Sequence, residues 1–185
     1  MKLWTVQDKA ILNLIAKDGV YYPDFAKSRF VAENPALSEL YGTVLKAFNT
    51  NNSADYAGLI FAFAQHDNQR ISEIRDFDEF QMVIRKGRPV LGSLWNSLQK
   101  KDCVVLELEY KEYFNPIFID LNDFQFLMPP VMAMYPYSRL DDYMIPRNIM
   151  NGIVDSSRMP SYIAHAHTPY IAVENIVCAY PMFDI

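Results

Sequence analysis

The sequence predicts an α+β fold in which helices pack on a bent or split, mostly antiparallel sheet. Three observations support this class. A strand, a helix and a return strand follow one another within residues 3–22, residues 34–48 form an amphipathic helix, and residues 103–110 alternate in polarity like a half-buried strand. We expect residues 1–185 to form one globular domain, because 185 residues suit one core better than two.

The first unit begins with a short strand expected at residues 3–4. Thr5 follows as the expected N-cap of a helix, whose apolar residues recur at helical spacing. Gly19 then supplies a C-terminal stop, because glycine readily adopts the left-handed conformation that ends many helices. Residues 20–22 are the expected return strand.

The second helix, expected over residues 34–48, begins with Asn34 as a cap and Pro35 at the first helical position. Its apolar residues form one stripe, which should face the core. The stripe comprises Leu37, Leu40, Tyr41, Val44, Leu45 and Phe48.

The middle of the chain gives mixed signals. Residues 58–63 are an apolar run that periodicity cannot assign to a strand or a helix. Residues 76–86 predict a short helix ended by Gly87, and three prolines beyond residue 128 (Pro129, Pro130 and Pro136) predict an irregular segment.

The clearest strand covers residues 103–110, with Glu107 and Glu109 on one face and apolar residues on the other. Residues 117–119 are expected to form a neighbouring strand, and residues 176–180 a last strand. The two glutamates could divide acid and base roles, or simply form the solvated face of the strand.

Composition narrows the classes of function. The net charge of −5 argues against general binding to duplex DNA, which needs clustered Lys and Arg. The start of the chain lacks an apolar signal segment, and no stretch is long and apolar enough for a membrane span, so we expect a cytoplasmic protein. Cys103 and Cys178 lie in apolar runs and should be buried, free thiols. Tyrosines are numerous, which is common at pockets, at interfaces and at the rim of a core.

Common catalytic signatures do not occur. The sequence contains no Gly-x-Ser-x-Gly, no Walker A and no Gly-x-Gly-x-x-Gly pattern, which disfavours kinases, nucleotide triphosphatases and Rossmann dehydrogenases. His165 and His167 would share one face of a strand and could bind a metal, but no third ligand is indicated, so we assign no metal site.

Residues 88–96 combine a cation, turn residues and an aromatic residue without clear periodicity. Such a segment can line a pocket for an anionic or planar ligand through Arg88 and Trp95. The alternative is a loop pinned by a buried Trp95.

Several segments resemble a bacterial and phage-associated family known as domain of unknown function 3841. They are residues 2–7, 18–21, 105–109 and 119–120 and the segment around Trp95. The resemblance is clearest over the first 25 residues and from about residue 89 to residue 123. The family name carries no activity.

The order of elements also looks like that of ADP-ribosyltransferase-like domains, which hold NAD in a cleft between two small sheets. The analogy implies a catalytic glutamate on a later strand, for which Glu107 is the first candidate, with Glu109 and Glu174 as alternatives. Where those enzymes carry His or Arg on the first strand, this chain has Trp4 and Gln7.

We therefore expect a protein with an ADP-ribosyltransferase-like cleft, which binds a nucleotide or serves to modify a macromolecule. NAD is the candidate cofactor, and whether the protein is an enzyme stays open. The expected site combines one catalytic residue with four ligand-binding residues: Glu107, Trp4, Gln7, Arg88 and Trp95. The alternative is a non-enzymatic interaction or inhibitor module of phage or bacterial conflict systems. The expected partner is a small molecule or a protein, with no duplex DNA and no membrane.

Overall fold

The computed structural model describes residues 1–28, 31, 35–67, 70–111, 114–122 and 161–185. The cap expected at Asn34 and the irregular segment expected around Pro129, Pro130 and Pro136 lie outside these residues. No helix within the described ranges is long and apolar enough to cross a membrane.

The main sheet has the strand order β6-β7-β3-β1-β5-β9, with β4 paired to β3, and every ladder in it is antiparallel. Its strands are β1 (Lys2–Asp8), β3 (Ile60–His66), β4 (Ile71–Ser72), β5 (Cys103–Glu109), β6 (Ile117–Asp120), β7 (Ile163–Thr168) and β9 (Ile176–Pro181). A second, two-stranded sheet joins β2 (Val20–Tyr21) to β8 (Ile171–Ala172). The α+β class with a mostly antiparallel sheet is confirmed.

The main sheet is split between β1 and β3. Strand β1 pairs with β5 along its whole length, whereas its described register with β3 consists of one pair, Trp4 with Phe63. Just beyond that pair the Thr5 hydroxyl donates to the Phe61 carbonyl at 2.6 Å. A side chain therefore satisfies a strand carbonyl at the point where the backbone ladder ends.

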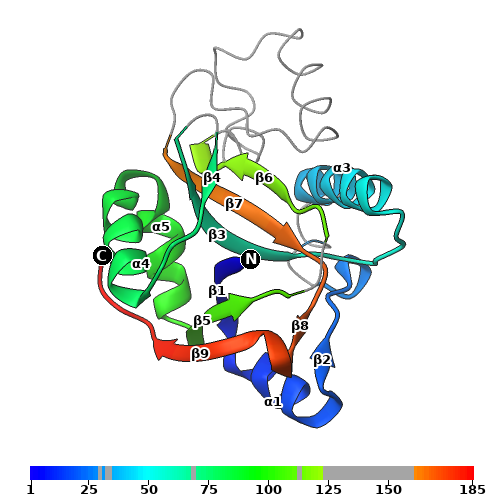
Figure 1. Ribbon diagram of the computed structural model, residues 1–185, viewed down its shortest axis with the longest axis horizontal. Helices are drawn as coiled ribbons and strands as arrows, with labels where there is room; N and C mark the ends of the chain where they lie inside the picture. Colours follow the sequence, from blue (N-terminus) through cyan, green and yellow to red (C-terminus); the bar gives the residue numbers. More distant parts are fainter. Residues whose placement is uncertain (29–30, 32–34, 68–69, 112–113, 123–160) are drawn as a thin grey trace, which may run out of the picture.

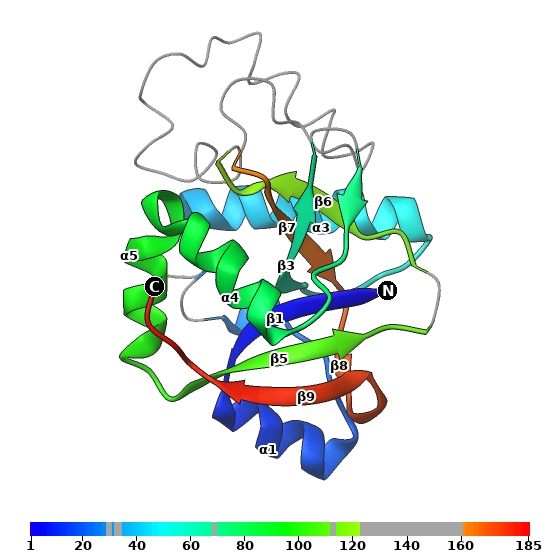
Figure 2. The ribbon, with the colours of Figure 1, turned by 60° about the vertical axis from the view of Figure 1, so that its left-hand side comes forward.

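Helices cover both faces of the sheet (Figures 1 and 2). Helix α3 (Pro35–Asn52) packs on β6 through an apolar cluster, and α4 (Phe77–Lys86) with α5 (Arg88–Gln99) packs on β1 and β5 through another. Helix α1 (Lys9–Asp18) packs against the third apolar cluster, which lies on the opposite face of the sheet. Two short 3-10 helices, η1 (Phe25–Lys27) and η3 (Val173–Asn175), complete the described elements.

The first helix begins later than expected. Thr5 is not its N-cap, because β1 continues through Asp8, whose side chain accepts from the Ala10 amide. Pairing with β5 keeps Thr5 in the strand and fully buries it. Gly19 does end the helix, in the left-handed conformation with φ of 79°.

Helix α3 confirms the second expected helix and extends it to Asn52. Tyr41, Val44 and Phe48 of the predicted stripe are buried, and Leu45 is half-buried. The side chains of Leu37 and Leu40 lie outside the described part of the chain.

Helix α4 confirms the helix expected over residues 76–86, with Asp76 as the N-cap. The ambiguous run at residues 58–63 contributes to strand β3. Strand β6, however, is not a neighbour of β5 as expected, since it lies at the far edge of the sheet and pairs with β7.

Residues 88–96 do not form the expected loop but most of helix α5. Pro89 occupies the first turn, where its missing N–H is tolerated. Leu91 and Trp95, four residues apart, are both fully buried on one face of the helix.

The two thiols have different environments. Both are free, but Cys103 is buried and Cys178 is exposed. Cys178 was expected to be buried. It lies on β9, the last strand of the sheet, which leaves that residue accessible to solvent.

Candidate functional site

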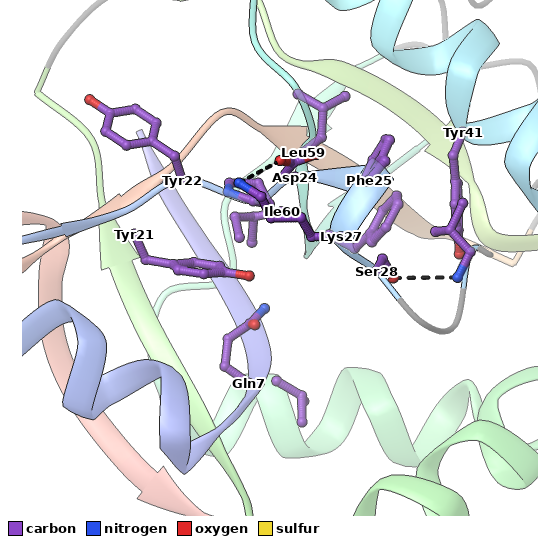
Figure 3. A pocket seen from close by; sticks show the side chains of 14 residues that line it. Gln7, Tyr21, Tyr22, Asp24, Phe25, Lys27, Ser28, Tyr41, Leu59 and Ile60 are labelled. Carbon is purple, nitrogen blue, oxygen red and sulfur yellow. Dashed lines mark hydrogen bonds and ion pairs between the residues drawn. The ribbon is translucent and has the colours of Figure 1, made fainter.

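A cavity of about 610 Å³ opens where β1 and β3 diverge, and the β2–η1 segment forms another of its walls (Figure 3). Aromatic side chains make up much of the lining: Tyr21, Tyr22, Phe25, Tyr41 and Phe61. The polar lining comes from Gln7, Asp24, Lys27 and Ser28. This size and this mixture of apolar and polar groups are typical of small-molecule sites.

Backbone contacts hold the β2–η1 segment in place. The Phe25 amide donates to the Ala57 carbonyl at 3.0 Å, and the Val173 amide donates to the Gly19 carbonyl at 2.9 Å. Gly58 lies directly against the Pro23 backbone, so closely that a β-carbon there would be 2.8 Å from the Pro23 carbonyl carbon. The cavity wall therefore depends on a glycine at position 58.

One side of the cavity is a stack of aromatic rings. The centroids of Tyr41 and Phe61 are 4.9 Å apart, and those of Phe25 and Tyr41 are 5.3 Å apart. His165 stacks on Phe61 at 5.0 Å. Burial raises the pKa of Tyr41 to about 12, so its phenol stays neutral near pH 7.

Tyr21 and Tyr22 follow one another on and after β2 and differ in exposure. Tyr22 is 56% exposed, and its ring lies 6.4 Å from that of Tyr56 and 5.6 Å from that of Tyr170. Tyr21 is partly buried, and burial, followed by the charge of Asp24, raises the pKa of its phenol. Tyr21 therefore presents a neutral phenol to the cavity.

The charged groups in the lining neutralise each other. Lys27 and Asp24 form an ion pair at 2.9 Å. The hydrogen bond from Lys27 is the main cause that lowers the pKa of Asp24, so this carboxylate is ionised at neutral pH. The pair leaves the cavity close to electrically neutral.

Trp4 and Trp95, predicted to bind a ligand, are fully buried and belong to one apolar cluster. Phe80 lies between them, at 4.9 Å from Trp4 and 6.2 Å from Trp95. Each indole N–H donates to a carbonyl, Trp4 to Ile74 at 2.9 Å and Trp95 to Phe183 at 2.7 Å. In this conformation neither indole exposes a face on which a ligand ring could stack.

Glu107, the predicted catalytic residue, lies opposite Trp4 in the β1–β5 ladder and is buried. One carboxylate oxygen pairs with Lys2 Nζ at 2.6 Å, and the other accepts from the Tyr180 hydroxyl at 3.1 Å. These contacts tie β1, β5 and β9 together, and Glu107 is not part of the cavity lining.

Gln7 is the one predicted site residue that lines the cavity. Successive side chains of a strand point to opposite faces, so Gln7 and Trp4, at odd and even positions of β1, lie on opposite faces of that strand. Arg88 is exposed at the start of α5 and is not part of the lining. The structure thus brings Trp4, Trp95 and Glu107 to one face of the sheet and Gln7 to the opening of the split.

Sequence reasoning missed a second polar cluster at the ends of β3 and β6. His66 Nε2 lies 2.6 Å from Asp120 Oδ2, which also accepts from the Ser161 amide and hydroxyl at 2.9 Å each. Burial opposes ionisation of Asp120, but the hydrogen bonds from His66 and Ser161 outweigh it and lower the pKa. Because Ser161 faces the carboxylate and not the imidazole, this is not the order of a Ser–His–Asp triad. No sequence signal connects residues so far apart.

His165 and His167 do share a face of β7, as expected for a strand, and both are buried. His167 Nδ1 lies 3.0 Å from the Ile117 carbonyl oxygen. Within the ranges that the structure describes, no group of three or more His, Cys, Asp or Glu residues is arranged to hold a metal ion.

Comparison with protein families, with curated proteins and with solved structures finds no match to this chain. The resemblances to domain of unknown function 3841 and to ADP-ribosyltransferase-like domains therefore stay predictions.

Proposed function

We propose that the protein binds a small molecule of the nucleotide class, with its planar ring in the cavity at the split of the sheet. The observation that carries the proposal is the cavity itself, about 610 Å³ in volume, whose lining includes five aromatic residues. Ring stacking on Tyr and Phe contributes binding energy to any planar ligand, and the few polar groups can select its orientation.

NAD is the first candidate ligand. The resemblance to ADP-ribosyltransferase-like domains supports it, because those enzymes hold NAD between two sheets. Here the cavity lies between the two halves of a split sheet, one containing β1 and β5 and the other β3 and β7. We assign no catalytic residue, since Glu107 is engaged by Lys2 and Tyr180 away from the cavity lining.

Calorimetric titration tests the proposal with a matched pair of variants. Tyr22 lines the cavity and is 56% exposed, whereas Tyr162 is 57% exposed and is not part of that lining. Loss of one stacked ring costs about 1–3 kcal/mol of binding free energy. We expect Tyr22→Ala to weaken NAD binding by that amount and Tyr162→Ala to leave it unchanged.

Two results would contradict the proposal. One is that the parent protein binds none of NAD, ADP-ribose, adenosine and nicotinamide. The other is that Tyr22→Ala and Tyr162→Ala bind as tightly as the parent, which would place the ligand elsewhere.

A further inference from the structure

Gln7 has a terminal amide whose orientation is set by its neighbour on β1. Thr5 Oγ1 donates its single hydrogen to the Phe61 carbonyl at 2.6 Å. The same oxygen lies 2.7 Å from Gln7 Nε2 and can only accept from it. The amide nitrogen of Gln7 must therefore face Thr5, and the amide oxygen must face away.

The outward oxygen of Gln7 is an acceptor that the described residues leave without a donor. The phenolic oxygen of Tyr21 points toward the same place from β2, and Figure 3 shows it directed at the Gln7 amide. The described residues also give the Tyr21 hydroxyl no hydrogen-bond partner, and as a neutral phenol it can donate as well as accept. Two polar groups with complementary capacity thus converge at one side of the aromatic cavity.

We propose that this pair selects a planar ring whose edge carries an N–H donor beside an acceptor, as in a carboxamide or an aminopurine. The exocyclic N–H of the carboxamide or amine donates to Gln7 Oε1, and the adjacent acceptor accepts from the Tyr21 hydroxyl. The inference rests on the proposed function, since it describes how the same cavity chooses its ligand. Thr5 is a positioning residue that acts through Gln7.

The same geometry rejects a carboxylate on the ring. A carboxylate has only acceptors, so it would face the Gln7 oxygen without a hydrogen between them. No free positive charge in the lining compensates, because Lys27 is paired with Asp24 at 2.9 Å. An ionised acid should therefore bind more weakly than the amide of the same shape.

Two pairs of compounds test this, and in each pair the ring system is the same but only one member carries the N–H donor; nicotinate also carries the carboxylate charge that the site should reject. Nicotinamide is compared with nicotinate, and adenosine with purine riboside, which lacks the exocyclic amine. We expect the parent to bind the donor-bearing member of one pair at least about tenfold more tightly, the effect of one well-formed hydrogen bond. The pair that discriminates identifies the ring that occupies the cavity.

Variants assign the discrimination to Gln7. Gln7→Met keeps the length of the side chain but removes the oxygen. It should bring the tenfold ratio of the dissociation constants of the two members of the discriminating pair to near one. Thr5→Val frees the amide to rotate and should lower the ratio without abolishing binding, while Tyr162→Ala should leave it unchanged. Thermal unfolding of each variant verifies the fold, and if Gln7→Met does not fold, Thr5→Val decides, because a ratio as large as that of the parent would show that the Gln7 amide does not discriminate.

The outcomes separate this inference from the proposed function. If the parent binds none of NAD, ADP-ribose, adenosine and nicotinamide, the proposed function is refuted, and this inference fails with it. If ligands bind but both ratios are near one, or if Gln7→Met preserves a ratio, the cavity binds ligands and the role of Gln7 is wrong.

Discussion

Replacing Gly58 with alanine should destabilise the protein and distort the cavity. The new β-carbon would be 2.8 Å from the Pro23 carbonyl carbon and oxygen and 3.0 Å from the Asp24 amide nitrogen, all backbone atoms that cannot rotate away. Overpacking of this kind costs about 1–3 kcal/mol, and the less flexible unfolded chain offsets about 0.4–1 kcal/mol. We expect a net loss of about 1–2 kcal/mol.

Gly42→Ala is the matched control. Gly42 lies in helix α3, and a β-carbon there would meet nothing within 4 Å. Alanine should stabilise the helix by about 0.5–1 kcal/mol. Urea unfolding measures both variants, and the Gly58→Ala protein should also bind ligand more weakly because Pro23 and Asp24 line the cavity. Equal or greater stability of Gly58→Ala relative to the parent would refute the close packing inferred at this wall.

Three further perturbations test other parts of the structure. Phe48→Ala should lower the free energy of unfolding in urea by about 3–5 kcal/mol, because the ring is fully buried. Lys46 is exposed, so Lys46→Ala should change that free energy by less than about 0.5 kcal/mol. An equally small effect of both variants would show that α3 does not pack as described. Burial lowers the pKa of His167 from 6.5 to about 4, so the unfolded chain binds more protons across that interval and the free energy of unfolding should fall as the pH drops from 6.5 to 4. His167→Asn should reduce this dependence without abolishing it, because burial also lowers the pKa of His165, and an unchanged slope would contradict the assignment. Iodoacetamide should modify exposed Cys178 quickly and Cys103 slowly, since burial raises the pKa of the Cys103 thiol. Mass spectrometry of peptides measures both rates, and modification of Cys178 as slow as that of Cys103 would contradict the exposure of β9.

Local signals predicted local structure well. Gly19 ends α1 because a left-handed residue was needed there, and the helix expected over residues 76–86 forms and ends at Gly87. The alternation in β5 correctly placed Glu107 and Glu109 opposite the residues of one apolar cluster, since period-two alternation follows directly from strand geometry. The strand is not half-buried as expected, however, because Val105 and Glu107 are buried on the second face. These elements depend on residues within a few positions of one another.

Non-local pairing could not be predicted in the same way. Strand β6 follows β5 in sequence but pairs with β7, whose partner residues lie more than forty positions later. Helix α5 was missed because Pro89 and Gly92 weaken the helical pattern, while burial of Trp95 against α4 and the C-terminal residues stabilises it. Tertiary packing decided both cases.

The candidate site was predicted only in part. Gln7 lies at the cavity, but both tryptophans are core residues. Burying each large apolar ring against Phe80 stabilises the fold more than leaving it exposed for a ligand would. The abundance of tyrosine is the sequence signal that fits this cavity, but it was equally consistent with an interface or the rim of a core. The adjacent pair Tyr21 and Tyr22, shortly after Gly19, is its local form. The sequence could not indicate that β1 and β3 separate beside this pair.

A crystal structure of the protein with NAD is the most direct test of the central claim, that the split of the sheet is a ligand site. We predict electron density for a planar ring between Gln7, Tyr21 and the aromatic wall formed by Tyr41 and Phe61. A second cavity, of about 440 Å³, has Ser161 and Tyr162 in its lining. Density for NAD in that second cavity, or an empty split at saturating ligand, would contradict the claim.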